Sequence, residues 1–190
     1  MLSSITPLGQ RGRSSSWLRT VIAFWIGALL AAAVVFGVLG MLGQTVGLTG
    51  LHWSVSIAVV VAAMILDLLR VKPLGPRRQV NEDWLPQYRD WVIGFGFGSQ
   101  LGAGVTTVVP VWAVWSLLAL AALNGSHFAI LIGLGFAAGR AIPLLAAARV
   151  DRPERLATLM SHLARLDKPA MNALFGAYVV VLVIGVLYAG

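Results

Sequence analysis

The sequence has no cysteine and few charged residues. Cysteine is absent from all 190 positions, which excludes disulfide bonds, thiolate metal sites and thiol redox chemistry carried by this chain alone. Only 11% of the residues are charged and 58% are hydrophobic, with a mean hydropathy of +0.86. Since soluble domains carry about 25% charged residues, the composition excludes a soluble domain and predicts a polytopic membrane protein.

Acidic residues are also scarce, and the formal net charge is +7. Apart from Arg140, every Lys and Arg lies in the N-terminus, in 70–89 or in 149–168. These short basic segments between apolar runs indicate orientation in a membrane rather than binding to nucleic acid. They predict an all-α bundle in a bacterial inner (plasma) membrane that crosses five times, with the N-terminus cytoplasmic and the C-terminus outside.

The same pattern divides the chain into four parts. Residues 1–20 are predicted to form a basic cytoplasmic N-terminus, and 21–71 a first half of two helices. A cytoplasmic loop over 72–90 then leads to a second half of three helices over 91–190. The lipid bilayer is one expected partner, and a second copy of the chain or another membrane protein is the other.

The stretch 91–123 has no charged residue. As one straight helix it would be roughly 50 Å long, against a hydrocarbon core of roughly 30 Å. Pro110 removes a backbone donor inside it, and the β-branched run 105–109 lies beside this proline. We expect one long broken helix, as in transporters with a site at mid-membrane depth; the alternative is a kinked helix packed in a bundle.

Glycine recurs every fourth residue upstream of the expected break, at Gly94, Gly98 and Gly102. This spacing puts three bare backbone surfaces on one helix face and predicts close packing against a neighbouring helix. The glycines do not follow a strand and lack the spacing of a nucleotide-binding loop.

A further helix is expected over 152–168. Asp151 caps its start, Pro153 lies in its first turn, and apolar side chains then recur at helical spacing between basic ones. The pattern predicts an amphipathic helix that lies on the cytoplasmic membrane surface.

Few polar side chains lie within the predicted spans. We predict a solute-contacting site of Gln100, Thr106, Thr107 and Arg140 at the broken helix. Arg140 lies roughly 13 Å deeper than Arg149 along a helix axis, so it must snorkel, pair or line a watery cavity.

Two further residues, Pro143 and Asp67, have candidate roles within the predicted spans. Pro143 is a second expected helix break, because it follows Arg140 by three positions. Asp67 lies in the last turn of the second span, close to Arg70, where an interfacial ion pair and a functional role both stay open.

No catalytic or metal-binding set accompanies these residues. Ser99 and His127 are predicted at opposite faces of the membrane, which argues against a serine protease. No cofactor and no metal site is predicted, and we expect that the chain is not an enzyme.

From Trp91 onward the sequence resembles the cytochrome c biogenesis and thiol–disulfide interchange membrane family (CcdA/DsbD type). The resemblance rests on the glycine-rich run from Gly94 to Pro110 and on Gly139-Arg-Ala-Ile-Pro143. It implies inverted triplets of helices that carry reducing equivalents across the membrane. Thr106 and Thr107 stand where that family places its reactive cysteine, so its redox activity does not carry over.

Three functions follow as hypotheses. The first is a small-solute or ion transporter built around the polar break. The second is a non-transporting accessory subunit of a membrane complex, favoured by the small size and the glycine faces. The third is a redox relay in cytochrome c biogenesis, which requires a partner that supplies every cysteine.

Overall fold

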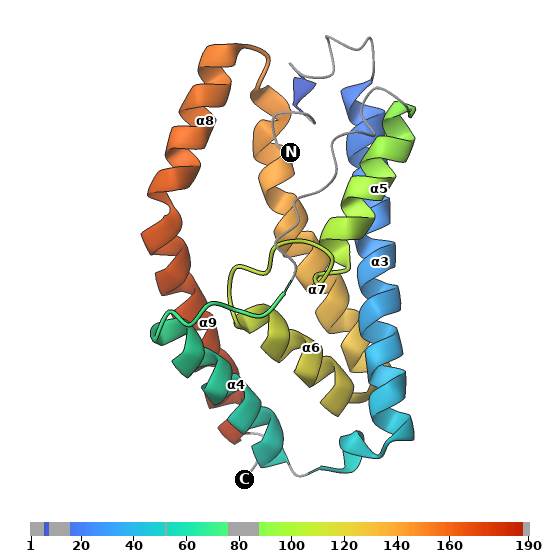
Figure 1. Ribbon diagram of the computed structural model, residues 1–190, viewed down its shortest axis with the longest axis vertical. Coiled ribbons are helices and arrows are strands. Elements are labelled where there is room, and N and C mark those ends of the chain that lie inside the picture. The colour runs from blue at the N-terminus through green and yellow to red at the C-terminus, as the bar shows by residue number, and fades with distance from the viewer. Residues whose placement is uncertain (1–5, 8–15, 52, 76–87, 188–190) are drawn as a thin grey trace.

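The computed structural model describes residues 6–7, 16–51, 53–75 and 88–187, and within them helices are the regular secondary structure (Figure 1). The predicted all-α class is confirmed. The elements are α3 (Trp17–Thr45), η1 (Leu48–Gly50), α4 (Trp53–Leu68), α5 (Asp90–Gly102), α6 (Ala113–Leu123), α7 (Gly125–Ala146), η2 (Ala147–Arg149), α8 (Pro153–Arg165) and α9 (Asp167–Leu187). Most of the predicted N-terminal part and of the 72–90 loop lies outside the described residues, so the domain boundaries stay predictions.

Helix α3 is the centre of the bundle and packs against α5, α6 and α7. One of its faces is buried, with Phe24, Ala28, Ala32 and Phe36 at four-residue spacing. The opposite face exposes large aliphatic side chains, namely Ile22, Ile26, Leu30, Val34 and Val38. A helix that exposes aliphatic residues along its length presents a lipid-compatible surface.

Helices α3 and α5 run parallel and in close contact. A Cβ atom added to any of the three glycines of α5 would overlap a backbone carbonyl of α3; Gly94, Gly98 and Gly102 face the carbonyls of Thr20, Phe24 and Ala28 in that order. Such close approach is possible only where the side chain is a hydrogen atom. The glycine repeat therefore places the two backbones against each other.

Helix α7 packs antiparallel to α3. Gly40 of α3 lies against Ala129 near the start of α7, whereas Gly133, one turn further along α7, lies against Phe36. The buried positions of α7 are mostly small residues, which include Ala129, Gly133, Ala137 and Ala141. Small residues on both helices thus allow α3 to lie between α5 and α7.

Three described helices are long and apolar enough to cross a membrane, namely α3, α7 and α9. The predicted five membrane crossings are therefore not confirmed, because only three of the described helices are long enough. Helix α4 has 16 residues, and the predicted 91–123 element is divided into α5 and α6 of 13 and 11 residues. The three long helices fit an integral membrane protein.

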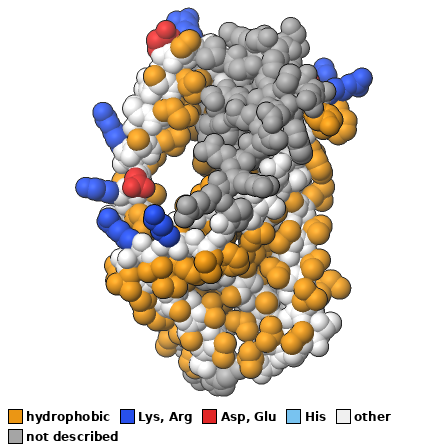
Figure 2. Space-filling view, in the orientation of Figure 1, with side chains coloured by type: hydrophobic (Ala, Val, Ile, Leu, Met, Phe, Trp, Pro, Cys, Tyr) orange, Lys and Arg blue, Asp and Glu red, His pale blue; other side chains and the backbone are white. Residues whose placement is uncertain are grey.

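The predicted 152–168 helix corresponds to α8, and α9 begins two residues after α8 ends. None of the α8 residues is buried. Helices α8 and α9 follow one another down one side of the bundle (Figure 1). In the same view, hydrophobic side chains cover the molecule over α4 and α6, while Lys and Arg lie along the flank formed by α8 (Figure 2). The placement of α8 on a membrane surface stays a prediction.

Candidate functional site at the helix break

The predicted long helix is interrupted between α5 and α6, where residues 103–112 are not helical. The chain leaves the helix at Gly102, eight residues before Pro110, and not at the proline itself. Gly104 adopts a φ of 76°, a left-handed conformation that glycine tolerates without strain. Gly104 thus turns the chain out of α5, and Pro110 is an exposed residue near the end of the interruption.

Arg140 of α7 reaches the C-terminal end of α5. Its guanidinium donates to the Leu101 carbonyl and to the Thr107 hydroxyl, both at 3.4 Å, and lies 5.3 Å from the centre of the Phe136 ring. A cation near the last carbonyls of a helix interacts favourably with the helix dipole. The ring face adds a cation–π contact. Arg140 is therefore tied to the upstream end of the break.

Asp67 of α4 contacts the downstream end of the break. Its carboxylate accepts hydrogen bonds from the backbone N–H groups of Trp112 at 2.7 Å and Ala113 at 3.2 Å. The hydroxyl of Tyr178 in α9 donates to the same carboxylate at 2.8 Å. Residue Asp67 is only 6% exposed. It is therefore a buried N-terminal cap of α6 that another helix, α4, supplies.

The two halves of the broken helix thus end on opposite charges from two different helices. Helix C-termini favour cations and N-termini favour anions, and the break presents the C-terminus of α5 and the N-terminus of α6. Arg140 meets the first and Asp67 meets the second. Because lipid cannot satisfy free backbone groups, these two side chains explain how an interrupted helix is tolerated here.

Two tryptophans fix the start of α6 to the segment that follows α4. The Trp112 indole donates to the Val71 carbonyl at 2.9 Å, and the Trp115 indole donates to the Leu74 carbonyl at 2.8 Å. Residues 71–75 therefore lie against α6, part-way along the bundle (Figure 1). The beginning of the predicted cytoplasmic loop is packed against a helix.

The structure brings together some of the predicted site residues. Thr107 is 6% exposed and contacts Arg140. Thr106 is exposed, and its hydroxyl donates to the backbone carbonyl of Gln100. The half-buried Gln100 thus enters these contacts through its backbone. Helix α7 continues through Pro143 to Ala146, so the chain is not broken at this second proline.

Tyr178 is the residue of this site that the sequence did not single out, and Asp67 was singled out without its partners. Of the two roles left open for Asp67, the ion pair with Arg70 is not observed, because the carboxylate contacts α6 and α9 instead. One signal was present in the sequence. Helix α6 starts after Pro-Val-Trp with no Ser, Thr, Asp or Asn in the capping position, so its cap must come from elsewhere in the chain.

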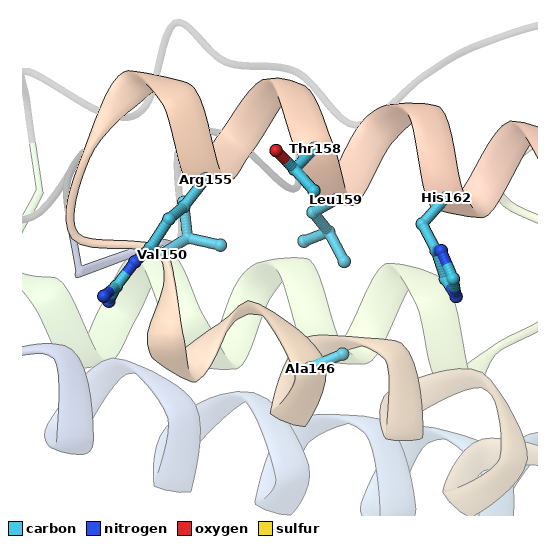
Figure 3. A pocket seen from close by; sticks show the side chains of 6 residues that line it. All are labelled: Ala146, Val150, Arg155, Thr158, Leu159 and His162. Carbon is cyan, nitrogen blue, oxygen red and sulfur yellow. The ribbon is translucent and has the colours of Figure 1, made fainter.

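Two hollows lie beside these helices. One of about 170 Å³ lies between α4, α6 and α9 and includes Ser116 and Tyr178 in its otherwise apolar lining. The other, of about 450 Å³, lies between α8 and the end of α7. Figure 3 shows Arg155, Leu159 and His162 projecting from α8 toward it. The first adjoins the break, and the second does not.

Comparison with known proteins gives three similar relatives. The chain is 31% identical over 156 residues to a protein of Paracoccus denitrificans, and 30% identical over 132 residues to one of Paracoccus versutus. A third, from Methylorubrum extorquens, is 28% identical over 151 residues. All three are named methylamine utilization protein MauF. No protein-family model and no solved structure matches the chain.

The alignments with the MauF proteins cover 66% to 75% of this chain and 48% to 55% of the relatives. The chain therefore spans about half the length of the curated relatives it matches. The resemblance to the thiol–disulfide interchange family is wrong, since the similar relatives are MauF proteins. Their name supports neither transport nor cytochrome c biogenesis.

Proposed function

We propose that the chain is an integral membrane protein that serves as an accessory component of a methylamine utilization system. The observation that carries this proposal is the 31% identity to a MauF protein over 75% of the chain. It corresponds to the second of the three sequence-based hypotheses, a non-transporting accessory subunit, and gives that hypothesis a metabolic setting.

The contacts at the break favour a structural role for Asp67 rather than a catalytic one. The Asp67 carboxylate is occupied by two backbone N–H groups and a tyrosine hydroxyl. Catalytic acids and bases need a free position toward a reacting group. The buried carboxylate of this site instead stabilises the start of a helix.

The orientation of the chain forms part of the proposal. Helices α3, α7 and α9 alternate in direction along the bundle (Figure 1), so three passes place the start of α3 and the end of α9 on opposite sides. The basic residues of 149–168 lie between α7 and α9, and such residues favour the cytoplasmic side of a membrane. The N-terminus is then cytoplasmic and the C-terminus outside.

The accessory role requires a protein partner in the membrane. Helix α9 offers a surface for one, because Tyr178 is its only buried residue among those described. Its exposed residues include Val179, Val180, Val183 and Ile184, a surface that either lipid or an apolar helix can cover.

Co-purification of a tagged chain tests the proposal. The tagged chain is extracted from membranes of cells grown on methylamine, and the recovered proteins are identified. The expected result is recovery of another methylamine utilization protein in a constant ratio to the tagged chain. Methylamine uptake by liposomes that contain the purified chain alone would contradict the accessory role and revive transport.

A further inference from the structure

The two charges at the break differ in how well they are satisfied. Asp67 accepts three hydrogen bonds, and the two shortest are 2.7 and 2.8 Å. Arg140 makes two contacts of 3.4 Å, both to uncharged oxygens. Hydrogen bonds of a guanidinium to a carboxylate are usually about 2.7–2.9 Å. The cation is therefore held loosely, while the anion is fully engaged.

No carboxylate among the described residues lies within ion-pair distance of Arg140. The ion pair found in the described part of the chain joins Arg155 to Asp151, away from the break. An arginine side chain has five N–H donors, and the two contacts of Arg140 use one each. Three N–H donors thus have no acceptor in the described part of the chain. A half-buried guanidinium without a paired anion is costly.

Thr107 adds a further donor at the same place. Its oxygen accepts from Arg140, and no acceptor for its hydroxyl hydrogen lies among the described residues. Thr107 is 6% exposed, so bulk water reaches it poorly. A buried hydroxyl and a guanidinium with spare donors therefore converge where acceptors are missing.

We propose that Arg140 and Thr107 form a binding site for a singly charged oxyanion at the end of α5. The planar guanidinium suits the two oxygens of a carboxylate or a phosphodiester, and the Thr107 hydroxyl donates to one of them. A dianion is disfavoured, because the C-terminal carbonyls of α5 carry partial negative charge. The phosphodiester of an anionic phospholipid and a free carboxylate share this chemistry. The site does not depend on the methylamine link.

Binding to the purified full-length chain tests the site and separates the two sources. The lipid probe is dioleoylphosphatidylglycerol, with dioleoylphosphatidylcholine as the zwitterionic comparison, and native mass spectrometry counts the lipid retained. The carboxylate probe is sodium acetate against sodium chloride, measured as a shift of the thermal unfolding midpoint. The variants are Arg140→Gln, Arg140→Lys and Thr107→Val. Arg152→Gln is the matched control, since Arg152 is an exposed arginine at the start of α8.

If the occupant is a lipid phosphodiester, Arg140→Gln lowers phosphatidylglycerol affinity by about tenfold, or 1.4 kcal/mol. Thr107→Val lowers it by a smaller factor, Arg140→Lys retains part of it, and Arg152→Gln leaves it unchanged. If the occupant is a free carboxylate, acetate raises the unfolding midpoint of the wild type and of Arg152→Gln but not of Arg140→Gln or Thr107→Val.

Two results would overturn the site. One is equal binding of both probes by the wild type, Arg140→Gln and Thr107→Val. The other is an equal loss in Arg152→Gln, which would indicate general attraction to basic residues. Thr107→Val preserves volume and branching, so it decides the matter if Arg140→Gln fails to fold.

Discussion

The Tyr178 hydroxyl and the Asp67 carboxylate are joined by a 2.8 Å hydrogen bond across 111 residues of sequence. This bond ties α9 to α4, and the same carboxylate caps α6. Three helices from distant parts of the sequence thus meet at one acidic side chain. The stability of this half of the bundle should depend on it.

Replacement of Asp67 by Asn tests the cap. Asn keeps one acceptor oxygen but turns an NH₂ group toward backbone N–H groups, so we expect a loss of about 2–3 kcal/mol in stability. Thermal unfolding in detergent measures the loss as a lower midpoint. Asp151→Asn is the control, because it removes the partly exposed 2.8 Å ion pair with Arg155, worth at most about 1 kcal/mol. Equal midpoints for both variants would contradict the cap.

Tyr178→Phe isolates the contribution of α9. The hydroxyl is lost and the ring is kept, and we expect a stability loss of about 1–2 kcal/mol. Because Tyr178 and Asp67 share one hydrogen bond, the double variant with Asp67→Asn should lose less than the sum of the single losses. Strict additivity of the two losses would mean that the residues act independently.

Gly98→Ala tests the backbone contact between α5 and α3. A Cβ atom at this position would overlap the Phe24 backbone, so the helices must separate and the yield of folded protein should fall severalfold. Gly135→Ala is the matched control on α7, where a Cβ atom meets nothing within 4 Å. There alanine should leave the yield unchanged or add about 0.5–1 kcal/mol of helix stability. Similar yields for both variants would place the Gly98 face away from α3.

Reporter fusions test the orientation. One reporter is inserted between α8 and α9, after Leu166, and another is attached after Gly190. We expect cytoplasmic activity from the first and external activity from the second, because α9 alone separates them and is long enough to cross. Activity of both on the same side would show that α9 does not cross.

The elements predicted best from sequence are those specified by local pattern. The glycine spacing of α5 predicts a packing face, and the excess length of 91–123 predicts an interruption. The position of the interruption was harder to predict, because Pro110 is the stronger local signal but the conformation of Gly104 ends α5 first. The course of 71–75 depends on bonds to tryptophans 41 residues away.

The contacts of Asp67 escaped prediction for a similar reason. Arg70 is three residues away in sequence, so a local ion pair was the simplest expectation. The actual partners lie 45 to 111 residues away, and no local pattern specifies such distances. The proximity of Arg140 to Thr107 was predictable only as a shared depth in the membrane, because Arg140 lies in α7 and Thr107 lies in the non-helical segment between α5 and α6.

The measurement that most directly tests the proposed role is growth of the source organism after deletion of the gene. The deletion strain is grown with methylamine or with ammonium as the sole nitrogen source, with and without a copy of the gene restored. We expect loss of growth on methylamine alone, with recovery when the gene is restored. Equal growth of the deletion and parent strains on methylamine would contradict it.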